Sequence, residues 1–271
     1  MAQPVDSTRN RFLLSDCAIK KDISCWVRYY YRKCFGIASR KCIIHNMNTL
    51  EALEKGMSTY CESGVGLFYT QPINTISNIT LLISAYFAFR LIRTNHVNNK
   101  TIKILPFILA VTGIGSMLWH GMPSLLTNFA DTLPLSAFVL VSLFFLLDKL
   151  LNKRGLVWKI LLAFILVETP FIFHILPSLN GFVPYLIVFV FGVFLSYGLV
   201  KKYKILTSHL VTIIALFAMA FFFRTIDHTV CAVFSAGTHF IWHTLNALVF
   251  YLLIRVFILM DLKTLSLKRE Q

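Results

Sequence analysis

The chain has 271 residues, of which 57% are hydrophobic and 14% are charged. A typical soluble domain carries about 25% charged residues, so this composition excludes a soluble enzyme, a disordered chain and a collagen-like fibre. It is typical of a polytopic helical membrane protein, because long apolar runs need lipid around them. The net charge of +14 would also suit a nucleic-acid binder, but such a protein would not be so rich in Phe, Leu and Ile.

The chain begins with a basic tail, residues 1–59. The first 71 residues hold ten basic residues and five of the six cysteines, with no apolar run long enough to span a bilayer. The stretch that starts at Trp26 could lie on a membrane surface, and an unstructured extension before Met47 explains the composition equally well. Four tail cysteines have spacings that match no zinc-binding motif; they are Cys17, Cys25, Cys34 and Cys42.

Seven apolar stretches follow the tail, each of about 17–20 residues, which is the length that crosses the core of a bilayer. They do not alternate polar and apolar residues, so they predict helices rather than strands. The expected fold is an all-α bundle of seven transmembrane helices over residues 60–260, with a short basic tail at 261–271. The stretches cover 72–90, 103–121, 130–148, 158–176, 181–200, 206–224 and 237–256.

Lys and Arg are distributed unevenly between the two sets of loops. Fifteen of them lie in segments 90–103, 148–159 and 200–206 and in the tail from 255, whereas the loops 121–130, 175–183 and 224–236 hold only Arg224. Basic residues stay on the cytoplasmic side. The asymmetry therefore predicts a multi-pass protein, in an endomembrane or a bacterial inner membrane, with the N-terminus outside or luminal and the C-terminus cytoplasmic.

Only four acidic residues fall between 72 and 254, where a carboxylate is expensive and tends to be functional. Asp131 lies at the start of the third stretch. Asp148, beside Lys149, is interpreted as a residue at the end of a span. Asp227 lies near an outer end and could pair with Arg224 or His228. Glu168 lies inside the fourth stretch and is predicted to make a structural hydrogen bond or to line a pocket.

Five polar residues are expected to meet at the outer end of the bundle. In the second stretch Ser116 and His120 are four residues apart and share one helix face, and Asp131 follows eleven residues after His120. The last stretch begins with His239 and His243, again four apart, which is half of a common zinc site.

Three histidines plus water make an open, catalytic type of zinc site, in which a carboxylate and a hydroxyl can assist. A lone histidine in a membrane is more often an interhelical hydrogen-bonding group than a ligand, and His174 and His209 are interpreted in that way.

These residues carry a resemblance to the alkaline ceramidases, seven-span zinc hydrolases of the superfamily that also holds adiponectin-receptor-like proteins. The resemblance covers about residues 60–256. The spacing of eleven residues from His120 to Asp131 resembles that of the ceramidase branch, because the receptor branch has a longer spacing. The matching blocks are Cys61-Glu62 with Gln71-Pro-Ile-Asn-Thr-Ile-Ser-Asn78, Gly113-x-Gly-Ser-x-x-x-His120 with Asp131, Arg224-Thr-Ile-Asp227-x-x-x-Cys231, and His239-x-x-Trp-His243.

The resemblance implies roles for several residues. His120, His239 and His243 would bind Zn²⁺, while Ser116 and Asp131 would contact the reacting water and carbonyl. Cys61 and Cys231 match a cysteine pair that is disulfide-linked in related enzymes. Eukaryotic members also hold calcium just before the first span. Here Gln71 stands where a family glutamate is expected and Glu62 is the one strong ligand left, which argues against calcium regulation.

The resulting hypothesis is a zinc-dependent membrane amidase that hydrolyses ceramide-like lipids to a sphingoid base and a fatty acid. One alternative is an adiponectin-receptor-like receptor or scaffold with a structural zinc. Another is a related intramembrane hydrolase of a different lipid ester or amide. The expected partners are the lipid substrate and the bilayer, with no nucleic acid, and the sequence indicates no oligomeric state.

Overall fold

The structure, a computed structural model, describes residues 60–62, 70–172 and 182–269. The predictions for the tail 1–59 and for His174 lie outside these residues. Every regular element in the described ranges is a helix and none is a strand, which confirms the all-α prediction for them.

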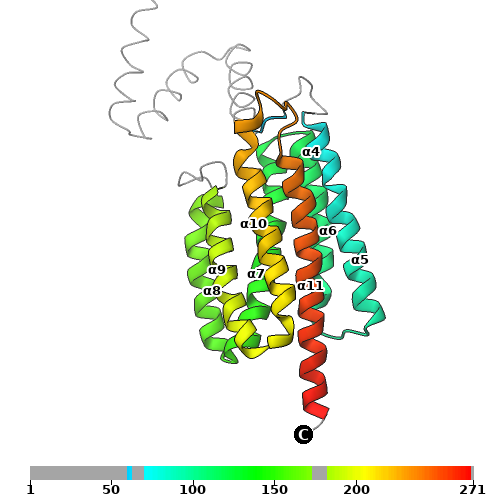
Figure 1. Cartoon of the computed structure of the whole chain (residues 1–271), viewed down its shortest axis with the longest axis vertical. Coiled ribbons are helices and arrows are strands. Elements are labelled where there is room, and N and C mark those ends of the chain that lie inside the picture. Colours follow the sequence, from blue (N-terminus) through cyan, green and yellow to red (C-terminus); the bar gives the residue numbers. More distant parts are fainter. Residues whose placement is uncertain (1–59, 63–69, 173–181, 270–271) are drawn as a thin grey trace, which may run out of the picture. The chain divides into compact units, whose positions relative to one another are not determined.

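The helices keep the labels of Figure 1 and follow one another along the chain with short connections. They are α4 (Pro72–Ser77), α5 (Ile79–Thr94), α6 (Lys100–Gly121), α7 (Leu125–Leu151), α8 (Arg154–Ile172), α9 (Phe182–Lys202), the 3₁₀ turn η1 (Lys204–Leu206), α10 (Thr207–Val230) and α11 (His239–Arg269).

Among the described residues, six helices are long and apolar enough to cross a membrane, consistent with a multi-pass protein. They cover Pro72–Thr94, Lys100–Gly121, Leu126–Leu151, Val183–Lys202, Lys204–Val230 and His239–Leu262. The remaining expected span, 158–176, overlaps α8, and the residues after Ile172 lie outside the described part. The count of seven spans therefore stays a prediction.

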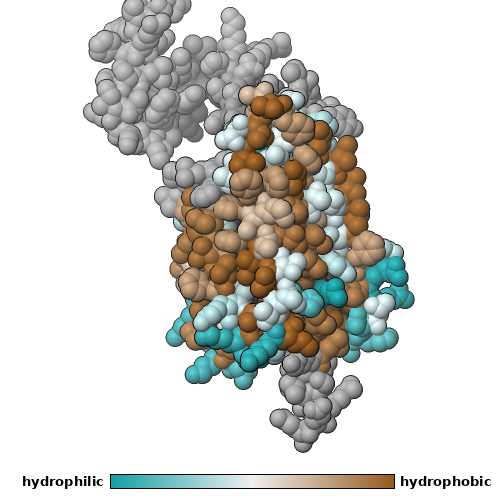
Figure 2. All heavy atoms as spheres, in the orientation of Figure 1, coloured by the Kyte–Doolittle hydropathy of each residue, from teal (hydrophilic) through white to brown (hydrophobic). Residues whose placement is uncertain are grey.

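The surface has the polarity that a membrane helix bundle needs. Figure 2 shows hydrophobic residues along the sides of the helices and hydrophilic residues gathered at one end. Exposed apolar side chains include Phe107, Trp158 and Phe194. The hydrophilic end is the end at which α5 connects to α6 and α7 to α8 (Figure 1), the loops that are rich in Lys and Arg. Which side of a membrane this end faces stays a prediction.

Glycines of α6 let two neighbouring helices approach closely, as small residues do in membrane bundles. A Cβ on Gly113 would lie 3.0–3.1 Å from Leu82 and Leu81 of α5. A Cβ on Gly115 would collide with the carbonyl of Ala130 on α7 and lie 3.0 Å from the amide nitrogen of Asp131. Helices α6 and α7 are therefore in backbone contact beside Ser116 and Asp131.

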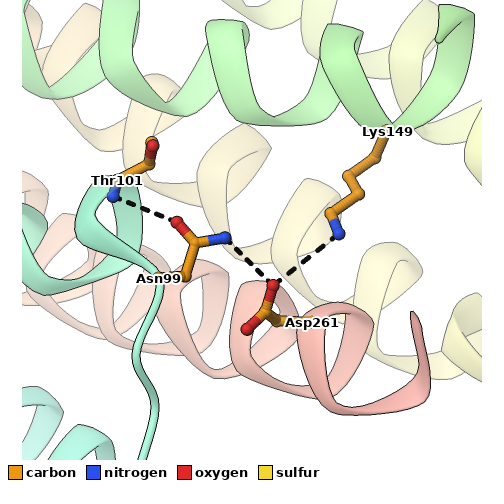
Figure 3. A network of polar contacts seen from close by, with 4 residues as sticks. All are labelled: Asn99, Thr101, Lys149 and Asp261. Atoms are coloured by element: carbon orange, nitrogen blue, oxygen red, sulfur yellow. Dashed lines mark hydrogen bonds and ion pairs between the residues drawn. The ribbon is translucent and has the colours of Figure 1, made fainter. Parts of the chain in front are cut away.

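A polar network holds the hydrophilic end together (Figure 3). The Asn99 side chain caps α6 by accepting a hydrogen bond from the amide of Thr101 at 3.0 Å, and its Nδ2 donates to Oδ1 of Asp261 at 3.0 Å. Lys149 of α7 forms an ion pair with the same Asp261 oxygen at 3.7 Å. The buried carboxylate of Asp261 thus joins α11 to α7 and to the start of α6, at the end of the bundle away from the histidines.

Candidate metal centre

Three buried histidines meet at one end of the bundle. His120 comes from the last turn of α6, and His239 and His243 come from the first two turns of α11. One ligand nitrogen from each ring lies within 4.8 Å of the other two, and the ring centroids are 4.6–5.1 Å apart. The three side chains form a group that could hold a metal ion.

Asp227 of α10 fixes the start of α11. Its Oδ1 accepts hydrogen bonds from the amides of Thr238 at 2.7 Å and His239 at 3.0 Å, and its Oδ2 accepts from the amide of Cys61 at 3.0 Å. An anion is stabilised at a helix N-terminus. Gly237 has a φ of +64°, and any Cβ there would collide with the Asp227 carboxylate. This capping role was missed by the sequence analysis, which considered only Arg224 and His228 as partners.

Two polar side chains orient the histidine rings. Nδ1 of His120 lies 2.6 Å from Oε1 of the buried Gln71, and Nδ1 of His243 lies 2.8 Å from the Ser77 hydroxyl. An amide oxygen only accepts, so Nδ1 of His120 carries the proton and its Nε2 keeps a lone pair for a metal. Such partners fix the tautomer of ligand histidines and raise their basicity. The sequence analysis did not find these two roles, although both residues lie in its first matching block.

Arg224 is buried beside His239. Its guanidinium lies 4.8 Å from the Tyr185 ring, 5.3 Å from the Trp242 ring and 5.8 Å from the Tyr60 ring, as in cation–π contacts. Its Nη1 is 3.4 Å from Nδ1 of His239. A guanidinium only donates, so this contact uses the Nδ1 lone pair. A metal ion on the other nitrogen of His239 would require this long contact to open.

Ser116 and Asp131 lie next to each other beside the histidines. Ser116 is one turn before His120 on α6, and its hydroxyl makes a side-chain hydrogen bond with Asp131 of α7. Both side chains line the same cavity as His239 and His243. The close approach of α6 and α7 at Gly115 makes this pair possible. The structure therefore brings all five polar residues that the spacing singled out into one site.

A disulfide bond links the segment before α4 to the end of α10. Cys61 and Cys231 are bonded, with their Cα atoms 5.2 Å apart and a sequence separation of 170. This confirms the pair expected from the resemblance. Tyr60, next to Cys61, stacks on the His239 ring with centroids 3.9 Å apart. The bond therefore holds an aromatic side chain against the candidate metal site.

Comparison with known proteins decides the family. The family model described as Ceramidase matches residues 59–271, most of the chain and the whole described helical part. The chain belongs to the Ceramidase family. A search among curated proteins gave no match. Membership in this family implies a membrane-embedded hydrolase that acts on the amide bond of a lipid, and it suggests a metal without saying which one.

The ceramidase-family site opens on a cavity of about 470 Å³. This is the usual size of a small-molecule pocket. Polar groups of the site line it together with apolar side chains such as Leu135, Val139 and Phe250. Glu168 of α8 also lines this cavity and is 6% exposed. The cavity is partly open, so a lipid tail could extend beyond it.

The residues described at the expected calcium position do not fit that ion. Oε1 and Oε2 of Glu62 accept hydrogen bonds from the amides of Ile73 at 2.7 Å and Asn74 at 2.8 Å, so the carboxylate caps α4. The side-chain oxygen of Gln71 is engaged by His120. Calcium takes six to eight oxygen ligands, usually including several carboxylates. Among the described residues, Glu62 is a helix cap rather than part of such a ligand set.

The other titratable residues discussed from the sequence lie away from the site. His209 is in the first turn of α10, at the opposite end of that helix from Arg224, and its Nδ1 is 3.5 Å from the Ser208 hydroxyl. Asp148 forms a solvent-exposed ion pair with Arg154 at 3.6 Å, near the junction of α7 and α8. Neither residue lines the cavity.

Proposed function

We propose that this chain is a zinc-dependent amidase that hydrolyses ceramide-like lipids to a sphingoid base and a fatty acid. The observation that carries the proposal is a group of three buried histidines, of which His239 and His243 line a largely apolar cavity together with Ser116 and Asp131. Membership in the Ceramidase family supports the substrate class.

The donor set suits zinc. Three imidazole nitrogens with a position left open are typical of catalytic zinc sites, whereas calcium and magnesium prefer oxygen ligands. The contacts of Nδ1 with Gln71 and with Ser77 direct the Nε2 atoms of His120 and His243 to a metal. We therefore assign His120, His239 and His243 as the zinc ligands. When bound there, Zn²⁺ supplies a Lewis acid and lowers the pKa of a water molecule towards about 7.

The chain's own residues handle the protons. The Asp131 carboxylate accepts a proton from the attacking water, whose oxygen bonds to the amide carbonyl carbon. The Ser116 hydroxyl donates to the carbonyl oxygen as negative charge develops there, and one such donor can contribute about 3 kcal/mol. The C–N bond then breaks, and Asp131 returns its proton to the departing nitrogen. The products are a carboxylic acid and an amine.

The apolar part of the cavity supports a lipid substrate. Walls of α7, α8 and α10 carry Phe, Leu, Ile and Val side chains around the polar site. An acyl chain would remove these side chains from contact with water, which stabilises the complex by about 25 cal/mol per Å² of apolar area. A partly open cavity allows lateral access from the bilayer.

A receptor or scaffold with a structural zinc needs a closed site of four protein ligands. The described residues hold three histidines within ligand distance of one another, and the nearby Asp131 is hydrogen-bonded to Ser116 and lines the cavity. This arrangement favours an enzyme over the receptor alternative.

The test is product analysis. Purified protein is incubated with a mixture of ceramides and acylated phospholipids, and the released amines and fatty acids are identified by mass spectrometry. We expect a sphingoid base and a fatty acid, loss of turnover with a zinc chelator, and recovery when zinc is restored. Release of another amine or alcohol from the mixture, with intact ceramide, would instead identify the chain as a hydrolase of a different lipid.

A further inference from the structure

Glu168 is an unusual residue for the wall of an apolar cavity. It lies on a face of α8 together with Phe164, Ile165 and Phe171, and all four side chains line the cavity. The residue is 6% exposed, and its buried Oε1 makes no hydrogen bond within the part of the chain that the structure describes. A buried polar atom without a partner is costly, so a partner from outside the chain would stabilise this wall.

Three hydroxyl groups of α7 and α8 in the lining already have partners. Thr169 donates to the carbonyl of Ile165 at 2.7 Å, Thr132 donates to that of Asn128 at 2.8 Å, and Ser136 donates to that of Thr132 at 2.8 Å. Each of these side chains is thus held by its own helix. The described hydroxyls of α7 and α8 in the cavity do not satisfy Glu168.

The charged groups of the cavity are also engaged elsewhere. The Arg224 guanidinium packs against the rings of Tyr185 and Trp242 and touches His239. Asp131 is hydrogen-bonded to Ser116. The carboxyl of Glu168 therefore faces the cavity as an acceptor that is separate from the candidate metal centre.

Glu168 lines the same cavity as the reacting groups. Ser116 lies on α6, Asp131 on α7 and Glu168 on α8, and all three side chains belong to one lining. A lipid amide whose carbonyl lies at Asp131 would therefore have the atoms next to its amide nitrogen inside the cavity that Glu168 lines.

We propose that Glu168 is a subsite for the hydroxyl-bearing head of the lipid amide. Its carboxyl oxygen accepts a hydrogen bond from a hydroxyl of the amine half, while the apolar walls hold the hydrocarbon chains. This subsite rests on the proposed function, and it would determine which lipid amides the site prefers. A neutral, hydroxylated head fits; a phosphate-bearing head would be repelled by the two carboxyl groups, Glu168 and Asp131.

The experiment compares two substrates in four proteins. The substrates are a ceramide and an N-acyl alkylamine of equal chain length without hydroxyl groups. The proteins are the wild type, Glu168→Leu, Glu168→Gln and the control Thr212→Val. We expect wild type to prefer ceramide in kcat/KM by about tenfold to a hundredfold, the range for one hydrogen bond to a carboxylate.

In Glu168→Leu the ratio of kcat/KM for ceramide to that for the N-acyl alkylamine should fall to within about threefold of one. Only the ceramide value should decrease, while the N-acyl alkylamine value stays the same. Glu168→Gln keeps a carbonyl acceptor and should retain part of the preference. Thr212→Val is nearly isosteric. The Thr212 hydroxyl donates to the carbonyl of Ser208 on its own helix and does not line the cavity, so the ratio should not change. Metal content and Tm show that each variant is folded.

The outcomes separate the subsite from the proposed function. An unchanged substrate ratio in folded Glu168→Leu and Glu168→Gln, with ceramide still cleaved, overturns the subsite and leaves the amidase intact. Should wild type cleave neither substrate, the amidase proposal fails, and the subsite is then judged by the shift in Tm that each lipid causes. A larger shift with ceramide in wild type that disappears in Glu168→Leu supports the subsite, and equal shifts overturn it.

Discussion

Replacing Gly115 by alanine should disable the site without touching any polar residue in it. The added methyl group would collide with the Ala130 carbonyl on α7, so the two helices would have to separate by about an ångström or more. Overpacking of this kind costs about 1–3 kcal/mol. Since Ser116 follows Gly115 directly and Asp131 follows Ala130, the same movement pulls the two side chains apart. A misplacement of about 1 Å can lower turnover about a hundredfold.

The assay measures Tm, bound metal and ceramide turnover in Gly115→Ala and in a matched control. Gly192→Ala of α9 is the control, because a Cβ at Gly192 meets nothing within 4 Å. The control should match wild type in bound metal and turnover, with a Tm at or above that of wild type because alanine favours a helix over glycine. Gly115→Ala should have a lower Tm and turnover reduced at least about tenfold. A Gly115→Ala protein with wild-type Tm and turnover would refute the close packing of α6 on α7 as the feature that aligns the site.

Three further predictions concern single groups of the site. Asp131→Asn should keep its metal but lose at least about a hundredfold in turnover, the usual scale for a missing general base; metal analysis beside kinetics checks this, and near-normal activity would contradict the proton-transfer role. Gln71→Leu should weaken zinc binding about tenfold to a hundredfold, because the partner of His120 is lost; a competition titration with a chelator measures it, and an unchanged affinity would count against this orienting contact. Removing the disulfide by Cys61→Ser with Cys231→Ser should lower Tm, since closing a 170-residue loop is worth at most about 5 kcal/mol in the chain-entropy model; recovery of both cysteines as free thiols in non-reducing peptide mapping of the wild type would contradict the bond.

The sequence predicted the helices well because hydropathy alone defines them. Long apolar runs coincide with α6, α7, α9, α10 and α11, and helical spacing puts His239 and His243 on one face. The limits of the last helix were less well predicted. It continues to Arg269, beyond the expected end at 256. The backbone hydrogen bonds of a helix can continue past the apolar stretch, so hydropathy does not define where the helix ends.

The partners of the site could not be predicted from local pattern. Gln71 contacts His120 from 49 residues away and Ser77 contacts His243 from 166 residues away, so these pairs depend on how whole helices pack. Asp227 was placed near an outer end with Arg224 or His228 as its partner, but its contacts with the amides of Thr238 and His239 depend on the turn at Gly237. The same polar residue types hydrogen-bond a histidine ring in one place and cap a helix in another, so the sequence alone does not distinguish the two roles.

The most direct test of the account is the zinc content of the purified protein. Wild type should hold about one Zn²⁺ per chain, and the double variant His120→Ala, His239→Ala should hold almost none, because one remaining histidine cannot compete with buffer. His209→Ala, a histidine at the other end of α10, serves as the control and should keep its zinc. Full zinc occupancy in the double variant would contradict the assignment of the three histidines as the metal site.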